Sequence, residues 1–259
     1  MKIAILGCGK MGSWLAKLLS KEHEVAVYDI ERPKANSIHG VSVLDSPEYL
    51  EGFCPDMLIN SVTLSKTILV FDSALQFIPK KCIICDMTSV KAGLAEYYAK
   101  SGFKFASVHP MFGPTFADMG AVKGENAIII SESDAGAKGF FSGLFRALGL
   151  NVFEYSFKEH DELMAYSLTT PFVSSLVFAG CLNRTTVPGS TFAKHLAIAR
   201  GLLAEDDTLL AEILFNDKSV LQIGKINSKL ELLKHIIIAR DYTEAKRFFD
   251  GLRENISGK

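Results

Sequence analysis

The feature that most constrains the fold lies at the start of the chain. An apolar run at residues 2–6 leads directly into a G-x-G-x-x-G turn at residues 7–12, and an amphipathic helix follows. In this setting the first glycine permits the tight turn, the second lets a diphosphate approach the backbone, and the third lets the helix pack closely on the strand. The amides and the dipole of the helix start attract an anion. We therefore predict a dinucleotide site that includes Gly7, Cys8, Gly9, Lys10, Met11 and Gly12.

An acidic residue after the second predicted strand indicates which dinucleotide binds. Asp29 follows the apolar run at residues 24–28, where a carboxylate can accept hydrogen bonds from ribose hydroxyls. That carboxylate repels a 2′-phosphate, which favours NAD, although Arg32 is near enough in sequence to favour NADP instead. A surface turn is the other interpretation of Asp29. Ser61 and Val62, at the end of another predicted strand, complete the predicted cofactor site.

Short β-rich runs alternate with helix-length segments through the first part of the chain. The runs cover residues 2–6, 24–28, 57–61, 82–86, 104–108, 127–130 and 152–155. This alternation is typical of a parallel sheet with crossover helices, and continuous apolar runs indicate that helices cover both faces. We predict an α/β fold in which residues 1–156 form a Rossmann-type, doubly wound, dinucleotide-binding domain.

Helical periodicity replaces the strand pattern after about residue 157. It covers residues 158–178, 192–204, 208–215, 220–239 and 243–252, with a loop at 180–190. Asp206 and Asp241 are predicted helix starts, because an aspartate can accept hydrogen bonds from first-turn amides. Residues 157–259 are predicted to form an all-helical substrate and dimerisation domain. The helix at 220–239 is apolar around more than one face, so we expect a homodimer, with one large monomer core as the alternative.

Composition and charge argue against several kinds of partner. The 28 basic and 29 acidic residues give a net charge of -1 and form no long block of one sign, which argues against nucleic acid and a membrane surface. No uninterrupted apolar run reaches the roughly 20 residues of a membrane span. Five cysteines and no signal-peptide pattern indicate a cytoplasmic protein. Cys82 and Cys85 form a C-x-x-C, but no second pair accompanies it, so buried thiols are favoured over a zinc site and no metal is expected.

Two polar segments follow predicted strands at the edge where open α/β sheets bind ligands. They are D-M-T-S-V-K at residues 86–91 and S-V-H-P-M-F-G-P at residues 107–114. A lone histidine is more often structural than catalytic. His109, however, lies at a strand end and is kept out of helical geometry by Pro110, which makes it a candidate for chemistry.

With these motifs the chain resembles the prephenate/arogenate dehydrogenases of tyrosine biosynthesis. That family has a strand-end D-x-x-S-V-K and an H-P-M-F-G-P, both present here in order, and an H-D-x-x-M-A that matches residues 160–165. The resemblance covers nearly the whole chain. It implies an oxidative decarboxylation in which hydride leaves C4 of a cyclohexadienol for the nicotinamide. The C4 hydroxyl becomes an oxo group, and CO2 leaves the ring carbon opposite.

The resemblance also implies roles for individual residues. His109 accepts the proton of the C4 hydroxyl and must be neutral, which an unperturbed pKa near 6.5 allows. Ser89 orients the hydroxyl or the histidine, and Phe112 and Gly113 contact the substrate. Lys91 has two open interpretations, as a functional residue or as a surface residue at a helix start.

The helical half departs from the family at two positions. A substrate-binding histidine is replaced by Pro171, and the arginine for the ring carboxylate aligns with Ala193 or Ala197. Helical spacing puts Asp161 and Met164 on a stripe that we interpret mostly as core. The adjacent face and the later helix supply the predicted substrate contacts, the cations being candidates for the missing arginine: Ser167, Thr170, Lys194, His195 and Arg200.

Several readings remain open at this level. Other two-domain reductases, such as the pyrroline-5-carboxylate reductases and 3-hydroxyacid dehydrogenases, share the glycine turn, but H-P-M-F-G-P argues against them. A nucleotide-binding regulator without turnover is favoured by the loss of the two substrate residues. Thr115 offers no carboxylate for an ammonium group, so prephenate is favoured over arogenate.

Overall fold

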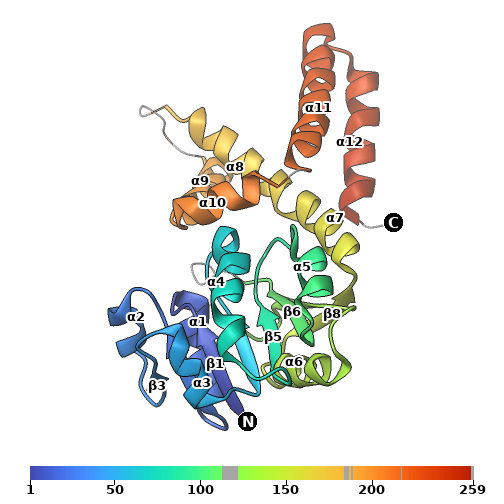
Figure 1. Ribbon diagram of the computed structural model, residues 1–259. Helices are drawn as coiled ribbons and strands as arrows, with labels where there is room; N and C mark the ends of the chain where they lie inside the picture. Colours follow the sequence, from blue (N-terminus) through green and yellow to red (C-terminus); the bar gives the residue numbers. More distant parts are fainter. Residues whose placement is uncertain (113–121, 184–186, 188, 217, 258–259) are drawn as a thin grey trace.

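The computed structural model describes residues 1–112, 122–183, 187, 189–216 and 218–257. Figure 1 shows a helix-covered sheet built from the N-terminal part of the chain, with a group of helices from the C-terminal part above it. The predicted α/β class, with a doubly wound sheet followed by helices, is confirmed.

Within the described residues, eight strands form one sheet in the order β3-β2-β1-β4-β5-β6-β7-β8. They are β1 (Lys2–Leu6), β2 (Glu24–Tyr28), β3 (Ser42–Val43), β4 (Met57–Asn60), β5 (Ile83–Asp86), β6 (Phe105–Pro110), β7 (Asn126–Ile130) and β8 (Asn151–Tyr155). Because the strand order reverses between β1 and β4, a crevice opens there at the carboxyl ends of the strands. This is the point at which doubly wound sheets bind dinucleotides.

The sheet differs from the prediction in two respects. The predicted parallel pairing is confirmed for most strands, but β6 and β7 are antiparallel, with Val108 opposite Ile129. Antiparallel neighbours need no crossover helix, so a strand pattern alone does not reveal this reversal. The two-residue β3, which pairs with β2, is too short to give a periodic signal.

Helices cover both faces of the sheet. They are α1 (Lys10–Leu19), α2 (Arg32–Asn36), α3 (Leu50–Phe53), α4 (Thr67–Ala74), α5 (Leu94–Ser101) and α6 (Ala135–Ala147), with 3-10 turns η1 (Pro47–Tyr49), η2 (Leu64–Lys66) and η3 (Leu75–Phe77). One core cluster joins alternate strand residues such as Ile3 and Ile5 to α1 and α6. The other joins their neighbours, such as Ala4 and Leu6, to α4 and α5. Alternate side chains thus fill two separate cores.

The chain passes from sheet to helices with no intervening loop. Ser156, next after β8, caps α7 (Phe157–Ser167) through a reciprocal pair of hydrogen bonds with Glu159. The single helix predicted at residues 158–178 is divided here into α7 and α8 (Thr169–Gly180). Pro171 accounts for the division, because it has no amide hydrogen to donate to the carbonyl of Ser167 one turn earlier. Phe157 and Met164 of α7 pack in the second core of the sheet.

Four more helices follow in the part of the chain that the structure describes. They are α9 (Ser190–Leu202), α10 (Asp207–Leu214), α11 (Ser219–Ala239) and α12 (Tyr242–Ser257). Asp206 caps α10, and Asp241 accepts hydrogen bonds from the amides of Thr243 and Glu244, so both predicted helix starts are confirmed. Figure 1 shows α11 and α12 projecting away from the sheet.

The α7–α8 segment is relevant to the prediction that the chain has no membrane-spanning helix. Phe157–Gly180 is long and apolar enough to cross a membrane by length and composition, and 17% of its most apolar window is buried. A count of uninterrupted apolar residues did not reveal this helix, because polar residues interrupt it. One such helix is weak evidence by itself, and its first turns pack on the sheet.

Candidate active site

The glycine turn after β1 is built as tightly as its spacing predicts. Gly7 has φ +93 and donates its amide hydrogen to the Tyr28 carbonyl at 2.8 Å. A Cβ on Gly7 would lie 2.7 Å from the Ser61 carbonyl oxygen, and one on Gly12 would lie 2.0 Å from the Gly7 carbonyl oxygen. Neither position therefore accepts a side chain. A Cβ on Gly9, by contrast, would meet no atom within 4 Å, which leaves open space beside the backbone at the start of α1.

Asp29 joins the end of β2 to the glycine turn. Its carboxylate accepts hydrogen bonds from the Cys8 amide at 2.6 Å and the Glu31 amide at 2.8 Å. Two nearby cations are already paired with acids. Arg32 lies 2.5 Å from Asp45, and Lys34 lies 2.6 Å from Glu31. Both cations are therefore already neutralised by an acid, which leaves them less able to bind a 2′-phosphate.

The remaining predicted cofactor residues lie around the same turn. Ser61 and Val62 follow β4, and the Ser61 amide donates to the Leu6 carbonyl at 2.7 Å, so the loop after β4 lies beside the glycine turn. Lys10 is exposed at the first position of α1, and Met11 is half-buried beside the first core. The open backbone at Gly9, the helix start and the acid at Asp29 together fit a dinucleotide.

A buried ion pair lies at the carboxyl end of β5. Lys91 Nζ is 2.5 Å from the Asp86 carboxylate and 2.8 Å from the Val108 carbonyl oxygen of β6. Thr88 and Tyr98 donate two further hydroxyl hydrogen bonds to Asp86, at 2.8 Å and 2.7 Å. Burial alone would raise the pKa of Asp86, but the Lys91 charge and the hydrogen bonds from Lys91 and Tyr98 hold that pKa below its usual value. The interpretation of Lys91 as a surface residue is wrong, since it is 1% exposed.

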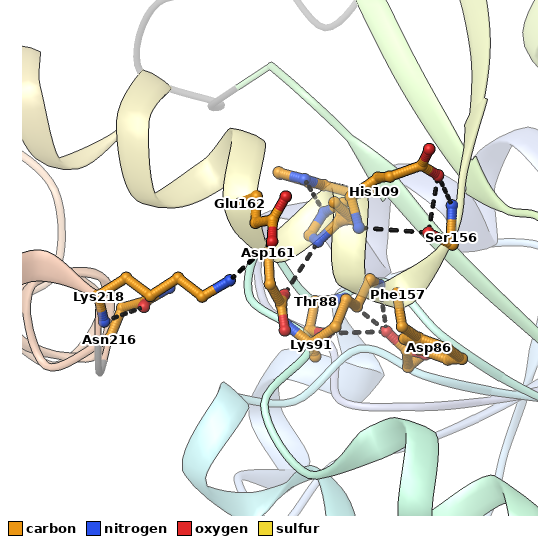
Figure 2. Close-up of polar contacts among 12 residues, drawn as sticks. Asp86, Thr88, Lys91, His109, Ser156, Phe157, Asp161, Glu162, Asn216 and Lys218 are labelled. Carbon is orange, nitrogen blue, oxygen red and sulfur yellow. Dashed lines mark hydrogen bonds and ion pairs between the residues drawn. The ribbon is translucent and has the colours of Figure 1, made fainter.

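His109 lies at the end of β6 beside a second histidine. Its Nδ1 is 3.1 Å from Nε2 of His160 in the first turns of α7, and Nδ1 of His160 is 3.2 Å from the Asp161 carboxylate. Asp161 also accepts a hydrogen bond from the Lys91 amide at 3.2 Å. Figure 2 shows Asp86, Lys91, His109 and Asp161 gathered where β5, β6 and α7 meet.

The electrostatics of this cluster keep both rings neutral. Burial lowers the pKa of His109 well below 6.5, and the neighbouring His160 and Lys91 lower it further. Burial also lowers the pKa of His160, against the opposing effect of Asp161. The expectation of an unperturbed His109 pKa near 6.5 is therefore wrong. The reason is that the sequence does not reveal how completely this strand end is covered.

The structure describes some of the other residues predicted near His109. Ser89 is half-buried in the segment between β5 and α5, and it makes no hydrogen bond to another described residue. Phe112 is buried, and its ring packs edge-on against Trp14 of α1, with centroids 5.4 Å apart. This contact links the motif after β6 to the helix of the glycine turn. Gly113 and Thr115 lie outside the described residues.

The substrate candidates of the helical part fall into two groups. Ser167 follows His160 by two helical turns and so shares its face, and its buried hydroxyl has no hydrogen-bond partner among the described residues. Thr170 is half-buried at the start of α8. Lys194, His195 and Arg200 are exposed on α9, where His195 packs near the Phe178 ring, with centroids 5.6 Å apart. Within the described residues, no hydrogen bond, ion pair or ring contact joins these three side chains to His109.

Sequence reasoning missed two polar links. The first is the contact between His160 and Asp161, because sequence reasoning assigns Asp161 to a helical stripe that it interprets mostly as core. The available signal is their position near the start of a capped helix that follows a strand directly. The second is Glu212 of α10, whose carboxylate accepts hydrogen bonds from the amides of Leu64 at 3.0 Å and Ser65 at 2.8 Å. This link, which holds α10 against the loop after β4, has no sequence signal.

The described residues contain no group of three or more histidine, cysteine or acidic side chains that could hold a metal ion. The five cysteines are free, and Cys82 and Cys85 are buried, as predicted. Burial raises the pKa of Cys82 to about 12, so it is a poor metal ligand or nucleophile at neutral pH.

Comparison with known proteins finds a matching family and several solved structures with a similar fold. Residues 15–128 match the family described as prephenate dehydrogenase, nucleotide-binding domain. The prephenate dehydrogenase of A. aeolicus, solved in complex with hydroxyphenyl propionate and NAD+, has a TM-score of 0.83 and 18% identity, covering 100% of this chain and 98% of that chain. The arogenate dehydrogenase of Synechocystis has a TM-score of 0.77 and 16% identity, covering 100% and 99%.

A more distant likeness extends to other dehydrogenases. The 3-hydroxyisobutyrate dehydrogenase of Mycobacterium tuberculosis, solved with L-serine, has a TM-score of 0.55 and 16% identity, covering 82% of this chain and 90% of that chain. A search of the curated proteins found no match. At such identities the solved structures support the fold, and the helical half is part of that likeness because the coverage extends over it.

Proposed function

We propose that this chain, which belongs to the prephenate/arogenate dehydrogenase family, is an NAD-dependent enzyme that oxidatively decarboxylates prephenate to 4-hydroxyphenylpyruvate. The observation that carries the proposal is the neutral, buried His109 at the carboxyl edge of a sheet whose switch point carries a dinucleotide-type glycine turn. In this proposal His109 is the general base that acts beside the bound cofactor, as oxidation of a hydroxyl requires.

The proposed cofactor is NAD, held by the glycine turn, the start of α1 and the loop that contains Ser61 and Val62. Asp29 is oriented by the amides of Cys8 and Glu31 to receive ribose hydroxyls. Arg32 and Lys34 are already paired with acids, which favours NAD over NADP. When bound, NAD supplies the acceptor for the hydride that leaves C4 of the substrate.

The protein's part of the reaction is proton transfer and positioning. His109 accepts the proton of the C4 hydroxyl as that oxygen becomes an oxo group, and its low pKa keeps it in the neutral form that can do so. Ser89 positions the hydroxyl from the segment after β5. Loss of CO2 then makes the ring aromatic, which drives the reaction forward.

Substrate recognition differs from the family at the two replaced positions. Ser167 has a buried hydroxyl with no hydrogen-bond partner among the described residues, and we assign it to a polar group of the substrate. Thr170 and Phe112 are assigned to the same substrate-binding surface. Lys194, His195 or Arg200 of α9 supplies the cation for a carboxylate in place of the missing arginine. We assign prephenate over arogenate because Thr115 offers no carboxylate for an ammonium group.

We further propose a cytoplasmic homodimer with a domain boundary at residue 156, the helical half forming the interface. The described part of α12 buries no residue, and α11 buries Ser219 and Ile236. Large apolar side chains on α11 remain exposed, among them Leu221 at 68% and Ile238 at 74%. A second copy of the chain would cover them.

The deciding experiment is an assay of purified enzyme with each cofactor and each substrate, following NADH or NADPH absorbance and identifying the product. We expect NADH and 4-hydroxyphenylpyruvate with prephenate and NAD, and slower turnover with arogenate. Faster turnover of arogenate would move the assignment to that substrate. Tight NAD binding in a calorimetric titration with no turnover of either substrate would instead identify a nucleotide-binding regulator.

A further inference from the structure

A chain of three polar side chains leads from His109 away from the sheet edge. Nδ1 of His109 contacts Nε2 of His160 at 3.1 Å, and Nδ1 of His160 contacts the Asp161 carboxylate at 3.2 Å. His160 is 0% exposed and His109 is 6% exposed, so water has little access to compete for these contacts. Nδ1 of His109 and both ring nitrogens of His160 therefore have one defined partner each.

The carboxylate at the end of this chain sets the position of every proton in it. A carboxylate only accepts hydrogen bonds, so Nδ1 of His160 carries the hydrogen that points to Asp161. In a neutral His160 the other nitrogen, Nε2, then has a lone pair and accepts from His109. Nδ1 of His109 must therefore carry its hydrogen. In a neutral His109 the lone pair is consequently on Nε2.

We propose that His160 and Asp161 are positioning residues that hold His109 in the tautomer with a free lone pair on Nε2. This nitrogen, and not Nδ1, then accepts the hydroxyl proton of the substrate. The inference rests on the proposed function for its catalytic meaning, but the tautomer itself is a property of the free protein. No residue of the chain of contacts other than His109 touches the substrate in this scheme.

The backbone and the neighbouring charges hold the arrangement in place. Asp161 is fixed by a second hydrogen bond from the Lys91 amide at 3.2 Å, and Lys91 is anchored by Asp86. Within the described residues, the charged and titratable groups that act on His109 are Lys91, from the segment after β5, and His160 of α7. Those that act on His160 in turn are Asp161, Lys91 and Asp86. Asp161 is the acid able to favour the proton-bearing form of His109 through His160 as the reaction proceeds.

The first test reads the tautomer directly, with no substrate and no cofactor. Nitrogen-15 NMR of histidine-labelled protein at neutral pH, with the His109 signals assigned by their loss in His109→Asn, reports which ring nitrogen is protonated. We expect hydrogen on Nδ1 and a lone pair on Nε2. In Asp161→Asn the amide can donate to His160 and reverse the chain, so the His109 signals should shift towards the other tautomer. Unchanged signals in that variant, or a wild type protonated on Nε2, would overturn the proposal.

The second test uses kinetics, with variants matched to the chemistry. Asp161→Asn should lower kcat about 10- to 1,000-fold with little change in KM, because a wrong tautomer removes the base without removing the binding site. Glu162→Gln, the same chemical change one residue further along the exposed side of α7, should leave kcat within about twofold. His160→Leu should lose activity, whereas His160→Gln, whose carbonyl can accept from Nδ1 of His109, should recover part of it.

The two tests separate the inference from the proposed function. If neither prephenate nor arogenate is turned over but the NMR result is as expected, the tautomer assignment stands and the proposed reaction fails. If the enzyme is active and both His160→Leu and Asp161→Asn keep normal kcat and pH dependence, the two residues have only a structural role and the inference fails.

Discussion

The carboxyl edge of the sheet and the α11–α12 pair are opposite cases in one chain. At the sheet edge, ionisable side chains are buried: Asp86 and Lys91 are 0% and 1% exposed, and His160 is 0% exposed. On α11 and α12, apolar side chains are exposed instead, including Val220 at 76% and Ile256 at 87%. Buried polar groups and exposed apolar groups are the two arrangements that need a specific explanation.

The difference shows which part of the chain is complete by itself. The charges buried at the sheet edge are paired within the same chain, so the polar groups of that region need no second molecule to satisfy them. The apolar surface of α11 and α12 has no such partner within the described residues, since the two helices project from the rest of the molecule (Figure 1). The sheet edge therefore supports the proposed chemistry, and the α11–α12 pair supports the proposed dimer.

The largest effect is expected at the sheet edge. His109→Asn should lower kcat about 100- to 10,000-fold, the usual range for loss of a general base, and leave the Kd for NAD within about twofold. Steady-state kinetics and calorimetric titration measure the two quantities. His39→Asn, an exposed histidine near β3, is the matched control and should have no effect. Near-normal turnover without the His109 imidazole would remove that residue from the mechanism.

The pH dependence of the wild type sharpens the same prediction. A lowered pKa means that His109 stays neutral as the pH falls through 6.5. We therefore expect kcat to remain on its plateau at pH 6.5 and to decline at more acidic pH, as His109 gains a proton. A decline centred at 6.5 or above would show that the imidazole is not buried as described.

The second effect concerns stability. Lys91→Met leaves the Asp86 carboxylate buried without its cation, which typically costs about 3–5 kcal/mol. Urea unfolding at fixed protein concentration measures the change. Lys104→Met removes a pair with Asp134 in which the lysine side chain is 69% exposed, and this control should unfold close to the wild-type midpoint. Equal midpoints for the two variants would refute the distinction between buried and exposed pairs.

A smaller effect is expected at the other end of the same sheet edge. Asp29→Ser removes a carboxylate that would receive the ribose diol and repel a 2′-phosphate, so the preference for NAD over NADP should narrow about tenfold. The ratio of kcat/KM for the two cofactors is the measurement. If the wild type already prefers NADP, Asp29 does not select the cofactor and Arg32 becomes the better candidate.

The smallest change, a factor of two in mass, tests the opposite region. Light scattering at micromolar concentration should give about twice the chain mass of 28.4 kDa. Replacing Leu221 and Ile238 together by glutamate should yield a monomer, because burying two charges in an apolar interface is unfavourable. Lys225→Glu on the same helix is the control and should remain dimeric. A wild-type mass near 28.4 kDa, the mass of one chain, would contradict the proposed dimer.

The sequence by itself determined the elements and the place of the cofactor turn. Seven strands, the helix starts at Asp206 and Asp241, and the roles of the glycines depend on local spacing, which a sequence records directly. The strand-end position of His109 followed for the same reason. Sequence patterns did not predict the antiparallel direction of β7 or the two-residue strand β3. Local spacing does not indicate the direction of a strand, and two residues are too few to give a periodic pattern.

Tertiary structure decided the electrostatics and the contacts between distant segments. Lys91 is buried and His109 has a lowered pKa because β5, β6 and α7 meet around them, although residues 109 and 160 are far apart in the chain. The link from Glu212 to the loop after β4 is equally non-local. Burial and long-range pairing are set by how the elements pack, and a pKa depends on both, so neither can be worked out from local sequence.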